Sequence, residues 1–477
     1  MKCMLINPSN STVYGMSMPL PYPPLGLLYV AATLEKEHEV CVYDYDIDLG
    51  NDEKLKEAIQ REKPDVVGLT ANTAIIASAK NIAKVVKEVN KDILVFIGGI
   101  HATMDPDYCI KVNDFDFVLK GEAEYTALAL ISHLRDSKFE EINGLWFKRN
   151  GEVVRNKEAD YIENLDELPF PARHLVKNPS AYTPPNAKRL PVTVMMTSRG
   201  CPGRCTFCCT KNLLGSRFRF RSPENVVKEI RHCVEKYGIK EVHLVDDVFT
   251  FNKERVFKIR DLMMESKLDV DFVLFNGVRA DQVDMPVLMA LKSLGVYQLG
   301  FGCESGSQEI LNNIKKGEKL ETIRNAYKMA KEVGFETWAY FVLGLPGETE
   351  ETLKETIKFA KEIDADFPKF HILAPYPNSD VYKELMKKNL IDDFDYEKYG
   401  IHTKPVHHLP GLSAEDMVRW QKKAYQSFYL RPRIIWKNIK RVRSFTQLKL
   451  NFKSAMFILR QAGIFSKKGF IKQTAKV

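Results

Sequence analysis

The stretch "SRGCPGRCTFCCT", residues 198–210, is the most cysteine-rich part of the chain and places four cysteines within nine positions. Cys201, Cys205 and Cys208 are separated by three and then two residues, and Cys209 directly follows the last of them. Thiolates are strong ligands for metal ions and for iron–sulfur clusters. The spacing therefore predicts that Cys201, Cys205 and Cys208 bind one metal centre.

The sequence around these cysteines favours an iron–sulfur cluster over a zinc ion. A structural zinc site needs a fourth Cys or His, and the five cysteines outside the stretch are isolated in sequence. A [4Fe–4S] cluster held by three thiolates leaves one iron open to another ligand. Gly200 and Gly203 permit a tightly curled loop, and Pro202 stiffens its start. A zinc or redox thiol loop is the alternative, and Cys209 is interpreted as a small buried neighbour.

The length of the chain, 477 residues, predicts two or three domains. Apolar residues make up 45% and charged residues 28%, which is typical of folded globular proteins. We find no apolar run of about 18 residues or more, and the N-terminus lacks the apolar core of a signal peptide. We therefore expect a cytoplasmic protein, in which clustered cysteines bind metal more often than they form disulfides.

Positive charge is concentrated in the last part of the chain. Residues 431–477 contain 13 Lys and Arg and no Asp or Glu, whereas the remainder holds 57 basic against 62 acidic side chains. Apolar residues recur at helical spacing within this tail, which is typical of a helix lying on the inner face of an anionic membrane. The alternative is a helix that covers the preceding domain, with its charges solvated. Nucleic acid is not expected, because no nucleic-acid-binding motif accompanies the tail.

Residues 1–140 alternate short β-rich runs with helical stretches. This order predicts an α/β domain with a parallel, doubly wound, Rossmann-like sheet, whose ligands lie beyond the carboxyl ends of the strands. Residues 141–188 are predicted to form a connecting hairpin and a proline-stiffened linker. The residues at the expected strand ends are Thr70, Asn72, Thr73, Gly98, Gly99, Gly121 and Glu122.

A second series of six β/α units spans residues 189–385 and predicts a partial (β/α)6 barrel of the TIM type. Residues 386–477 are expected to be helical and to end in the basic tail. Active sites of such barrels lie at the carboxyl ends of the strands. The polar residues expected there are Asp246, Asp247, Arg279, Asp281, Glu304, Glu348 and Asn378, together with the cysteine loop.

C-x3-C-x2-C after the first strand of a β/α barrel, with Phe207 before the third cysteine, resembles the radical S-adenosylmethionine (SAM) enzymes. The resemblance implies that Cys201, Cys205 and Cys208 are the catalytic cluster ligands and that the open iron binds SAM. An electron from an external donor of the flavodoxin or ferredoxin type then cleaves SAM to the 5′-deoxyadenosyl radical.

Other barrel positions carry the same resemblance. Glu304 in "GFGCES" and Asp247 after the second strand are implied contacts to SAM. Leu345 in "VLGLPGET" corresponds to the segment that packs against adenine, and Phe207 is implied to lie beside the cofactor. Arg279, Tyr376 and Asn378 are candidate substrate contacts.

A doubly wound domain before the barrel resembles the cobalamin-binding subgroup of these enzymes. The resemblance rests on "YPPLGLLYVAATLE" (22–35), "VVGLTANT" (66–73), "VFIGGIHAT" (95–103) and "GEAEY" (121–125). It implies cobalamin with its nucleotide tail in the N-terminal domain, where Thr70, Asn72 and Thr73 offer polar contacts. Gly98 and Gly99 would let the backbone approach that tail, and Gly121 and Glu122 would close the same edge.

The chain departs from the D-x-H-x-x-G motif by which many cobalamin proteins supply a histidine to cobalt. The corresponding stretch "YDYDIDLG" carries Asp44, Asp46 and Asp48 but no His. We therefore expect cobalamin without a protein histidine below the cobalt, or a domain that no longer binds it. His101 is expected to be a hydrogen-bonded loop residue rather than a ligand.

The resemblance implies a cobalamin-dependent radical SAM enzyme, in its leading form a C-methyltransferase acting on an unactivated carbon through the 5′-deoxyadenosyl radical and methylcobalamin. The substrate would be a small molecule or lipid-like. One alternative is non-methylating chemistry, such as the ring formation of anaerobic magnesium-protoporphyrin monomethyl ester cyclases or a lipid carbon–carbon coupling. An alternative of another class is a non-catalytic iron–sulfur or zinc protein.

Overall fold

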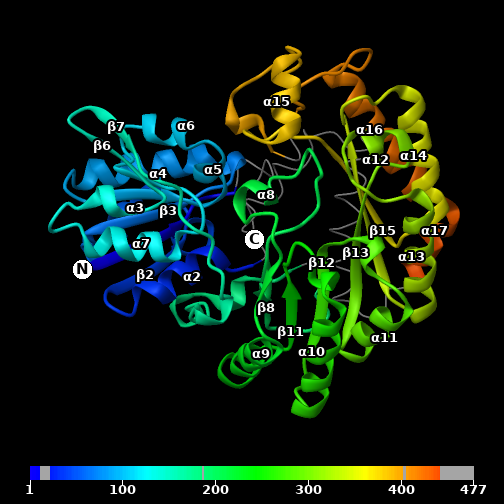
Figure 1. Cartoon of the computed structure of the whole chain (residues 1–477), viewed down its shortest axis with the longest axis horizontal. Coiled ribbons are helices and arrows are strands. Elements are labelled where there is room, and N and C mark those ends of the chain that lie inside the picture. The colour runs from blue at the N-terminus through cyan, green and yellow to red at the C-terminus, as the bar shows by residue number, and fades with distance from the viewer. Residues whose placement is uncertain (11–21, 185–186, 401–403, 441–477) are drawn as a thin grey trace, which may run out of the picture.

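The computed structural model describes residues 1–10, 22–184, 187–400 and 404–440. Figure 1 shows two α/β units side by side, the N-terminal one in blue and cyan and the second in green and yellow. Both predicted architectures are confirmed, a doubly wound sheet followed by an open β/α barrel. Most of the basic tail, residues 441–477, lies outside the described residues.

The N-terminal sheet has the strand order β2-β1-β3-β4-β5-β6-β7 over the described residues. Its strands are β1 (Lys2–Asn7), β2 (Glu39–Asp44), β3 (Val66–Thr70), β4 (Leu94–Gly98), β5 (Phe117–Leu119), β6 (Leu145–Arg149) and β7 (Glu152–Arg155). The first five are parallel, in one of the common doubly wound orders. This order brings the carboxyl ends of β1, β3 and β4 together at one edge.

The hairpin formed by β6 and β7 belongs to this sheet, whereas the sequence predicted it to be part of a connection. β6 pairs antiparallel with β5, and β7 pairs antiparallel with β6. An unpaired sheet edge exposes a row of backbone hydrogen-bonding groups. The hairpin therefore covers the edge that β5 would otherwise present.

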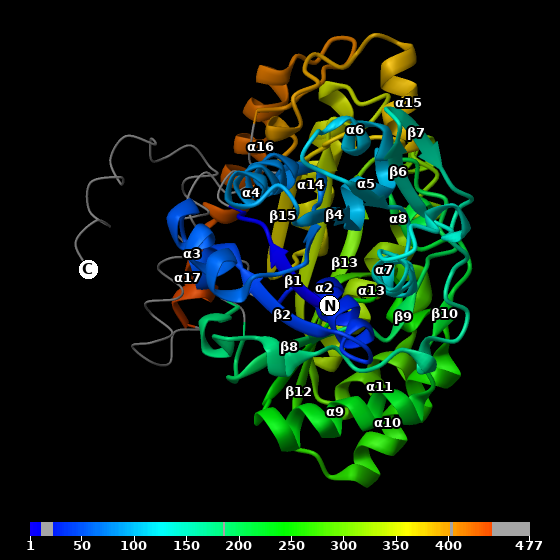
Figure 2. The ribbon, with the colours of Figure 1, turned by 90° about the vertical axis from the view of Figure 1, so that its left-hand side faces the viewer.

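Helices cover both faces of the N-terminal sheet, as Figure 2 shows with this domain toward the viewer. Helices α2 (Leu25–Leu34) and α7 (Ala123–Ser132) pack with Cys3 and Leu5 on one face. On the other face, Met4 and Ile6 pack with the remaining helices. These are α3 (Asp52–Glu62), α4 (Ile76–Val89), α5 (Gly99–Met104) and α6 (Pro106–Lys111). The alternation along β1 explains its uninterrupted apolar sequence, because both faces are buried.

The barrel has the parallel strand order β8-β11-β12-β13-β14-β15 over the part of the chain that is described. Its strands are β8 (Val192–Met195), β11 (Glu241–Leu244), β12 (Asp271–Val278), β13 (Val296–Glu304), β14 (Glu336–Leu343) and β15 (Phe367–Ile372). Its helices are α9 (Pro223–Tyr237), α10 (Lys253–Ser266), α11 (Met285–Ser293), α12 (Gln308–Asn313), α13 (Leu320–Val333) and α14 (Glu350–Ile363). The outermost strands, β8 and β15, do not pair with each other, so the barrel is open as predicted.

The first barrel helix illustrates how local sequence sets these elements. The Ser222 side chain accepts a hydrogen bond from the Asn225 backbone at the start of α9, and Pro223 occupies its first turn. Gly238 ends the helix with a φ of 64°. Between these ends, Val226, Val227, Ile230 and Cys233 are buried in the hydrophobic core of the barrel.

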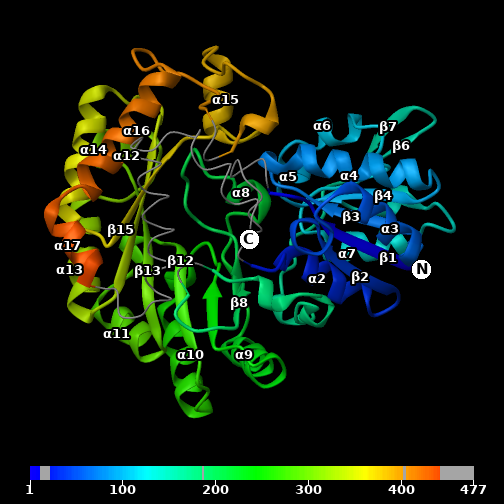
Figure 3. The ribbon, with the colours of Figure 1, turned by 180° about the vertical axis from the view of Figure 1, so that it is seen from behind.

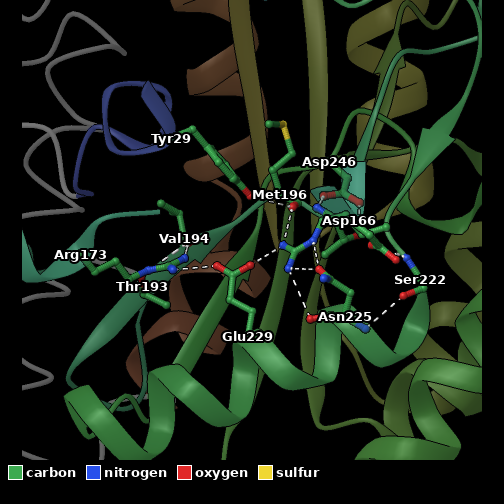
Figure 4. Close-up of polar contacts among 12 residues, drawn as sticks. Tyr29, Asp166, Arg173, Thr193, Val194, Met196, Ser222, Asn225, Glu229 and Asp246 are labelled. Atoms are coloured by element: carbon green, nitrogen blue, oxygen red, sulfur yellow. Dashed lines mark hydrogen bonds and ion pairs between the residues drawn. The ribbon is translucent and has the colours of Figure 1, made fainter. Parts of the chain in front are cut away.

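A buried ionic network ties the linker to α9 (Figure 4). The Glu229 carboxylate contacts Arg173 at 2.7 Å and also binds Arg221. Arg173 donates to the Val194 carbonyl at 2.8 Å, so the linker is attached to β8 as well. Because unpaired buried charges are costly, this network fixes the path of the linker beneath the barrel.

In its described part, residues 386–400 and 404–440, the region after the barrel is only partly helical, which corrects the prediction of helix from residue 386 onward. Helix α15 (Asp380–Lys387) is followed by an irregular segment with isolated bridges, Ile391 to His407 and Leu409 to Leu412. Gly400, Pro405, Pro410 and Gly411 disfavour a continuous helix there. Helices α16 (Ala414–Tyr429) and α17 (Pro432–Lys440) follow.

Helices α16 and α17 lie against the barrel beside α14 and β15 (Figure 3). Arg433 binds Asp364 at 3.0 Å and Lys437 binds Asp366 at 2.6 Å. Arg433 and Lys437 are therefore paired with the barrel. The position of α17 agrees with the alternative of a covering helix, but that alternative expected these charges to be solvated. Among the described residues, no helix combines the length and apolar character needed to cross a membrane.

Candidate cluster and cofactor sites

The cysteine loop follows β8 and is closed at its base by two short strands. β9 (Ser198–Arg199) pairs antiparallel with β10 (Arg219–Phe220). Gly200 has a φ of 85°, and a Cβ there would lie 2.2 Å from the Arg217 carbonyl. The Cys201 backbone donates to the Gly215 carbonyl at 3.2 Å. The loop therefore begins with a close backbone approach that requires glycine.

Backbone N–H groups and cationic side chains surround the sulfur atoms. Gly203 N donates to Cys201 Sγ at 3.4 Å, and Thr210 N donates to Cys208 Sγ at 3.5 Å. Burial raises the pKa of the Cys205 thiol to about 11, while the nearby Lys316 ammonium acts to lower that pKa. Burial also raises the pKa of the Cys201 thiol. A metal that binds these sulfur atoms must displace the thiol protons. The N–H groups and the cations favour the thiolate form that binds metal.

Three half-buried thiols on one loop, with hydrogen bonds to sulfur, are a donor set that fits a [4Fe–4S] cluster. In the described part of the chain, no group of three or more His, Cys, Asp or Glu side chains converges closely enough for a single metal ion. A cluster binds its thiolates through different irons, so its ligands need not converge on one point. Cys209 is the N-cap of α8 (Thr210–Leu213), and burial raises the pKa of its thiol to about 12.

Phe207 packs against the hydrophobic core of the barrel, directly before the third cysteine of the loop. Its side chain is half-buried, and it lies next to Thr206, whose backbone donates to the Ile314 carbonyl at 3.0 Å. The aromatic ring thus joins the cysteine loop to the body of the barrel.

The two aspartates after β11 have different partners. Asp246 accepts hydrogen bonds from Thr197 N at 2.6 Å and Ser198 Oγ at 2.7 Å, so it fixes the strand that leads into the loop. Asp247 accepts from Thr210 Oγ1 at 3.1 Å, directly beside the cysteines. Burial raises the pKa of the Asp247 carboxyl to about 6. Asp247 therefore lies where it can contact a molecule bound at the cysteine loop, whereas Asp246 holds the strand that leads into the loop.

Glu304 ends β13 with a left-handed φ of 60° and lies over Gly302. A Cβ at Gly302 would lie 2.5 Å from the Glu304 carboxylate, so the glycine makes room for this side chain. Lys316, almost fully buried, contacts Glu304 at 3.0 Å and Glu318 at 3.3 Å. The sequence did not single out Lys316, which has no motif and reaches Glu304 only through the fold.

The loop after β14 is held by Glu348. Its carboxylate accepts from Gly344 N at 2.5 Å and Leu345 N at 3.2 Å, and burial raises the pKa of this carboxyl to about 8. The Leu345 side chain is fully buried in the barrel core. A contact of Leu345 with SAM would therefore come from its backbone.

The predicted cobalamin contacts lie at the ends of β3, β4 and β5. Thr70 is half-buried, and a Cβ at Gly99, whose φ is 86°, would lie 2.4 Å from its Oγ1. Asn72 is exposed and its side chain accepts from Ala74 N at 3.0 Å. At Gly121 a Cβ would face open space. A Cβ at Gly98 would contact Leu119 and Ala123, and one at Gly99 would overlap Thr70, so of these three glycines Gly121 alone faces open space. The space at Gly121 fits the close approach of a bound nucleotide tail.

Thr73 and His101 bind each other and are both buried. His101 Nδ1 lies 3.1 Å from Thr73 Oγ1, and the ring is packed edge-on against Tyr108 and Tyr396. Burial lowers the pKa of the His101 imidazole to about 4, so the ring is neutral. His101 lies in α5 rather than in the predicted loop. The Thr73 hydroxyl is correspondingly engaged within the domain.

The stretch that replaces the histidine motif forms a π-helical turn, Tyr45–Leu49, which ends at Gly50. Asp44 accepts from Asn7 at 2.9 Å, and Asp46 accepts from the Ser9 hydroxyl at 2.5 Å. Burial raises the pKa of the Asp44 carboxyl to about 6. The aspartates are thus bound to neighbouring residues at the sheet edge.

Glu122 has partners that the sequence did not predict. Arg219 binds both of its carboxylate oxygens at 2.9 Å, and Arg199 binds one of them at 3.0 Å. Arg199 also binds Glu124 at 2.5 Å. We call Glu122, Glu124, Arg199 and Arg219 the interdomain clamp. The expected cofactor contact of Glu122 is replaced by this ionic interface, because its carboxylate is occupied by the barrel.

The two candidate cofactor sites meet at the domain interface. Helix α8, directly after the cysteines, packs against α5, which begins at Gly99. Asn378 donates to the Met104 carbonyl of α5, and Asn212 of α8 donates to the Asn378 carbonyl at 3.0 Å. The cysteine loop and the glycine-rich edge of the N-terminal sheet therefore face one another. Asn378, predicted as a substrate contact, joins the two domains.

Comparison with known proteins yields two matches to family models. The model for the radical SAM superfamily matches residues 195–360, which contain the cysteine loop and most of the barrel. The model for the B12 binding domain matches residues 11–131. The two matches fall on the two units that the structure shows.

Full-length relatives are similar to nearly the whole chain. An uncharacterized methyltransferase of Pyrococcus horikoshii is 34% identical, over 92% of this chain and 95% of that protein. An anaerobic magnesium-protoporphyrin IX monomethyl ester cyclase of Rubrivivax gelatinosus is 28% identical, over 90% of this chain and 78% of that protein.

A solved structure shares the fold across both domains. It is the radical S-adenosylmethionine methyltransferase TsrM of Kitasatospora setae with cobalamin and a [4Fe–4S] cluster bound. Its TM-score is 0.71 at 18% identity, over 97% of this chain and 99% of that one. The chain belongs to the radical SAM enzymes that carry an N-terminal B12-binding domain, whose cofactors are a [4Fe–4S] cluster, SAM and cobalamin.

Proposed function

We propose that this enzyme is a cobalamin-dependent methyltransferase that methylates an unactivated carbon of a small-molecule or lipid-like substrate by radical chemistry. When bound, the cluster supplies the electron that cleaves SAM, and cobalamin carries the methyl group to the substrate radical. The methyltransferase name of the Pyrococcus horikoshii relative, similar over nearly its whole length, supports this choice.

The observation that carries the proposal is the meeting of the two candidate cofactor sites. Helix α8 begins directly after Cys209 and packs against α5, which begins at the Gly98–Gly99 edge. A substrate at the carboxyl ends of the barrel strands would lie between the cysteine loop and that edge. Hydrogen abstraction and methyl transfer need this proximity, because both act on the same carbon.

The proposed roles follow from the surroundings of each residue. Cys201, Cys205 and Cys208 bind the cluster. Asp247, held by Thr210, and Glu304, held by Lys316, orient SAM. The remaining proposed cofactor contacts are Phe207 and the Leu345 backbone for SAM, and Thr70, Asn72, Gly98, Gly99 and Gly121 for cobalamin.

Analysis of the SAM products tests the proposal. The protein is reconstituted anaerobically with iron, sulfide and cobalamin, reduced, and incubated with methyl-deuterated SAM and a small-molecule and lipid extract. We expect 5′-deoxyadenosine and S-adenosylhomocysteine together, and a product that carries the labelled methyl group. S-adenosylhomocysteine without deoxyadenosine would contradict radical methylation. Neither product from a fully loaded protein would support the non-catalytic alternative.

The second candidate function is non-methylating radical chemistry, such as ring formation or lipid carbon–carbon coupling. The similarity to the Rubrivivax gelatinosus cyclase, which is 28% identical over 90% of this chain, supports this second candidate. Deoxyadenosine without S-adenosylhomocysteine would support this candidate over methyl transfer. The same assay therefore separates the two functions.

Two partners are proposed beside the substrate. An external electron donor of the flavodoxin or ferredoxin type would reduce the cluster. An anionic membrane surface would bind residues 441–477, which lie outside the described residues and contain nine Lys and Arg and no Asp or Glu. The proposal is restricted to this segment because Arg433 and Lys437 of α17 are paired with Asp364 and Asp366.

A further inference from the structure

Two arginines close the cysteine loop, one on each side of it. Arg199 directly precedes Gly200 and Cys201, and Arg219 follows the loop. The two residues pair with each other in the antiparallel register of β9 and β10. The base of the loop thus brings two positive charges next to each other.

Both arginines are neutralised by the other domain. Arg219 binds Glu122 at 2.9 Å through two hydrogen bonds, and Arg199 binds Glu122 at 3.0 Å and Glu124 at 2.5 Å. All four side chains are at most 6% exposed. Burial raises the pKa of the Glu122 carboxyl, but Arg219 and Arg199 hold that pKa below its usual value. The two arginines therefore hold the Glu122 carboxylate in its charged form inside the interface.

We propose that Glu122 and Glu124 are positioning residues for the cluster, because they keep the base of the cysteine loop closed. Without them, two adjacent buried arginines would repel each other and would lack most of their charged partners. The cysteine loop consequently takes its cluster-binding shape only while the N-terminal domain is docked. This inference rests on the family assignment of the loop and is independent of methyl transfer.

Cysteine alkylation of the full-length protein without cofactors tests the proposal. The variants are Glu122→Gln and Glu124→Gln, which keep the size of the side chain and remove its charge. The control is Glu229→Gln, because Glu229 is also fully buried and also bound by two arginines, Arg173 and Arg221, but lies on α9. Mass spectrometry measures the alkylation rate at Cys201, Cys205 and Cys208, and at Cys303, which is buried in β13 and reports unfolding of the barrel.

We expect Glu122→Gln to accelerate alkylation of the three loop cysteines by about tenfold, which corresponds to a loss of about 1.4 kcal/mol in the free energy of local opening. In Glu122→Gln, Cys303 should react at its native rate. Glu229→Gln destabilises the barrel as a whole, so it should accelerate alkylation of Cys303 but leave the loop rates within about twofold. Native loop rates in both clamp variants would overturn the proposal. The proposal would also be overturned if Glu229→Gln accelerated alkylation of the loop cysteines as much as Glu122→Gln does, because the effect would then not be specific to the clamp.

Two further observations keep the test decisive. Should Glu122→Gln not fold, Glu124→Gln leaves both Arg219 hydrogen bonds in place and is judged by the same criterion. In the reconstituted protein, an iron chelator should remove the cluster faster from the clamp variants than from Glu229→Gln. Alkylation needs neither SAM nor substrate, so a negative alkylation result would not contradict the proposed methylation. A negative methylation assay would likewise not contradict the proposed role of the clamp.

Discussion

Arg219 binds both carboxylate oxygens of Glu122 at 2.9 Å, although the two residues lie in different domains and are 97 positions apart. Such a bidentate pair fixes orientation as well as distance. It joins the strand after the cysteine loop to the residue before α7. The domain interface of this enzyme is therefore built directly onto the loop that carries the proposed cluster ligands.

Replacing the cysteines singly should separate cluster ligands from the bystander. Cys201→Ala, Cys205→Ala and Cys208→Ala should each lose most of the cluster iron after anaerobic reconstitution, because a three-thiolate site cannot spare a ligand. Cys209→Ala should retain about four irons per chain. Iron analysis and the visible absorbance of the cluster measure both. Loss of the cluster in Cys209→Ala would make Cys209 a ligand.

Glu348 should make stability depend on pH. Its folded pKa is raised to about 8, above the unfolded value, so the folded state keeps the proton longer than the unfolded state. The contribution of Glu348 to stability is therefore greatest at low pH, and it decreases from about pH 4.5 until about pH 8, by on the order of 5 kcal/mol.

Glu348→Gln removes this titration and keeps an acceptor for Gly344 N and Leu345 N. We expect the variant to match the native protein near pH 5 and to exceed its thermal unfolding midpoint near pH 9. Midpoints measured across this range for both proteins provide the check. A parallel decline in the two proteins would assign the pH dependence to other groups.

Glu229→Gln should destabilise the barrel, because Arg173 and Arg221 would lose their shared buried counter-charge. We expect a loss of about 3 kcal/mol, with the midpoint of thermal unfolding lowered by about 2–4 °C for each kcal/mol. Glu235→Gln on the same helix removes an exposed pair with Arg231 and should change stability by less than about 0.5 kcal/mol. Equal midpoints for the two variants would contradict this account of the network.

Shortening the chain should locate any membrane contact. A chain that ends at Lys440 keeps α17 and its ion pairs with Asp364 and Asp366 but lacks the nine basic residues beyond it. We expect the full chain to co-sediment with phosphatidylglycerol vesicles and the shortened chain to remain in the supernatant, with the difference reduced by salt. Equal sedimentation of the two chains would remove the tail as a membrane contact.

Local patterns in the sequence were sufficient to predict the two architectures and the cysteine loop. The spacing of Cys201, Cys205 and Cys208 is a local property, and so is the alternation of β-rich and helical runs that gives the doubly wound sheet and the open barrel. The sequence also predicted an unusual backbone conformation at Gly200, and its φ of 85° agrees with that prediction. This requirement is local, because it arises from the curvature of the loop itself.

The partners of charged side chains depended on tertiary structure. Glu122 was predicted to contact a cofactor but binds Arg199 and Arg219, because an ion pair across an interface is set by how the domains dock and leaves no local pattern. The β6–β7 hairpin joined the sheet for the same reason, since the edge of β5 becomes available only in the folded domain. The sequence by itself thus determined which residues form the loop and the strands. The tertiary structure decided which charges hold that loop in place.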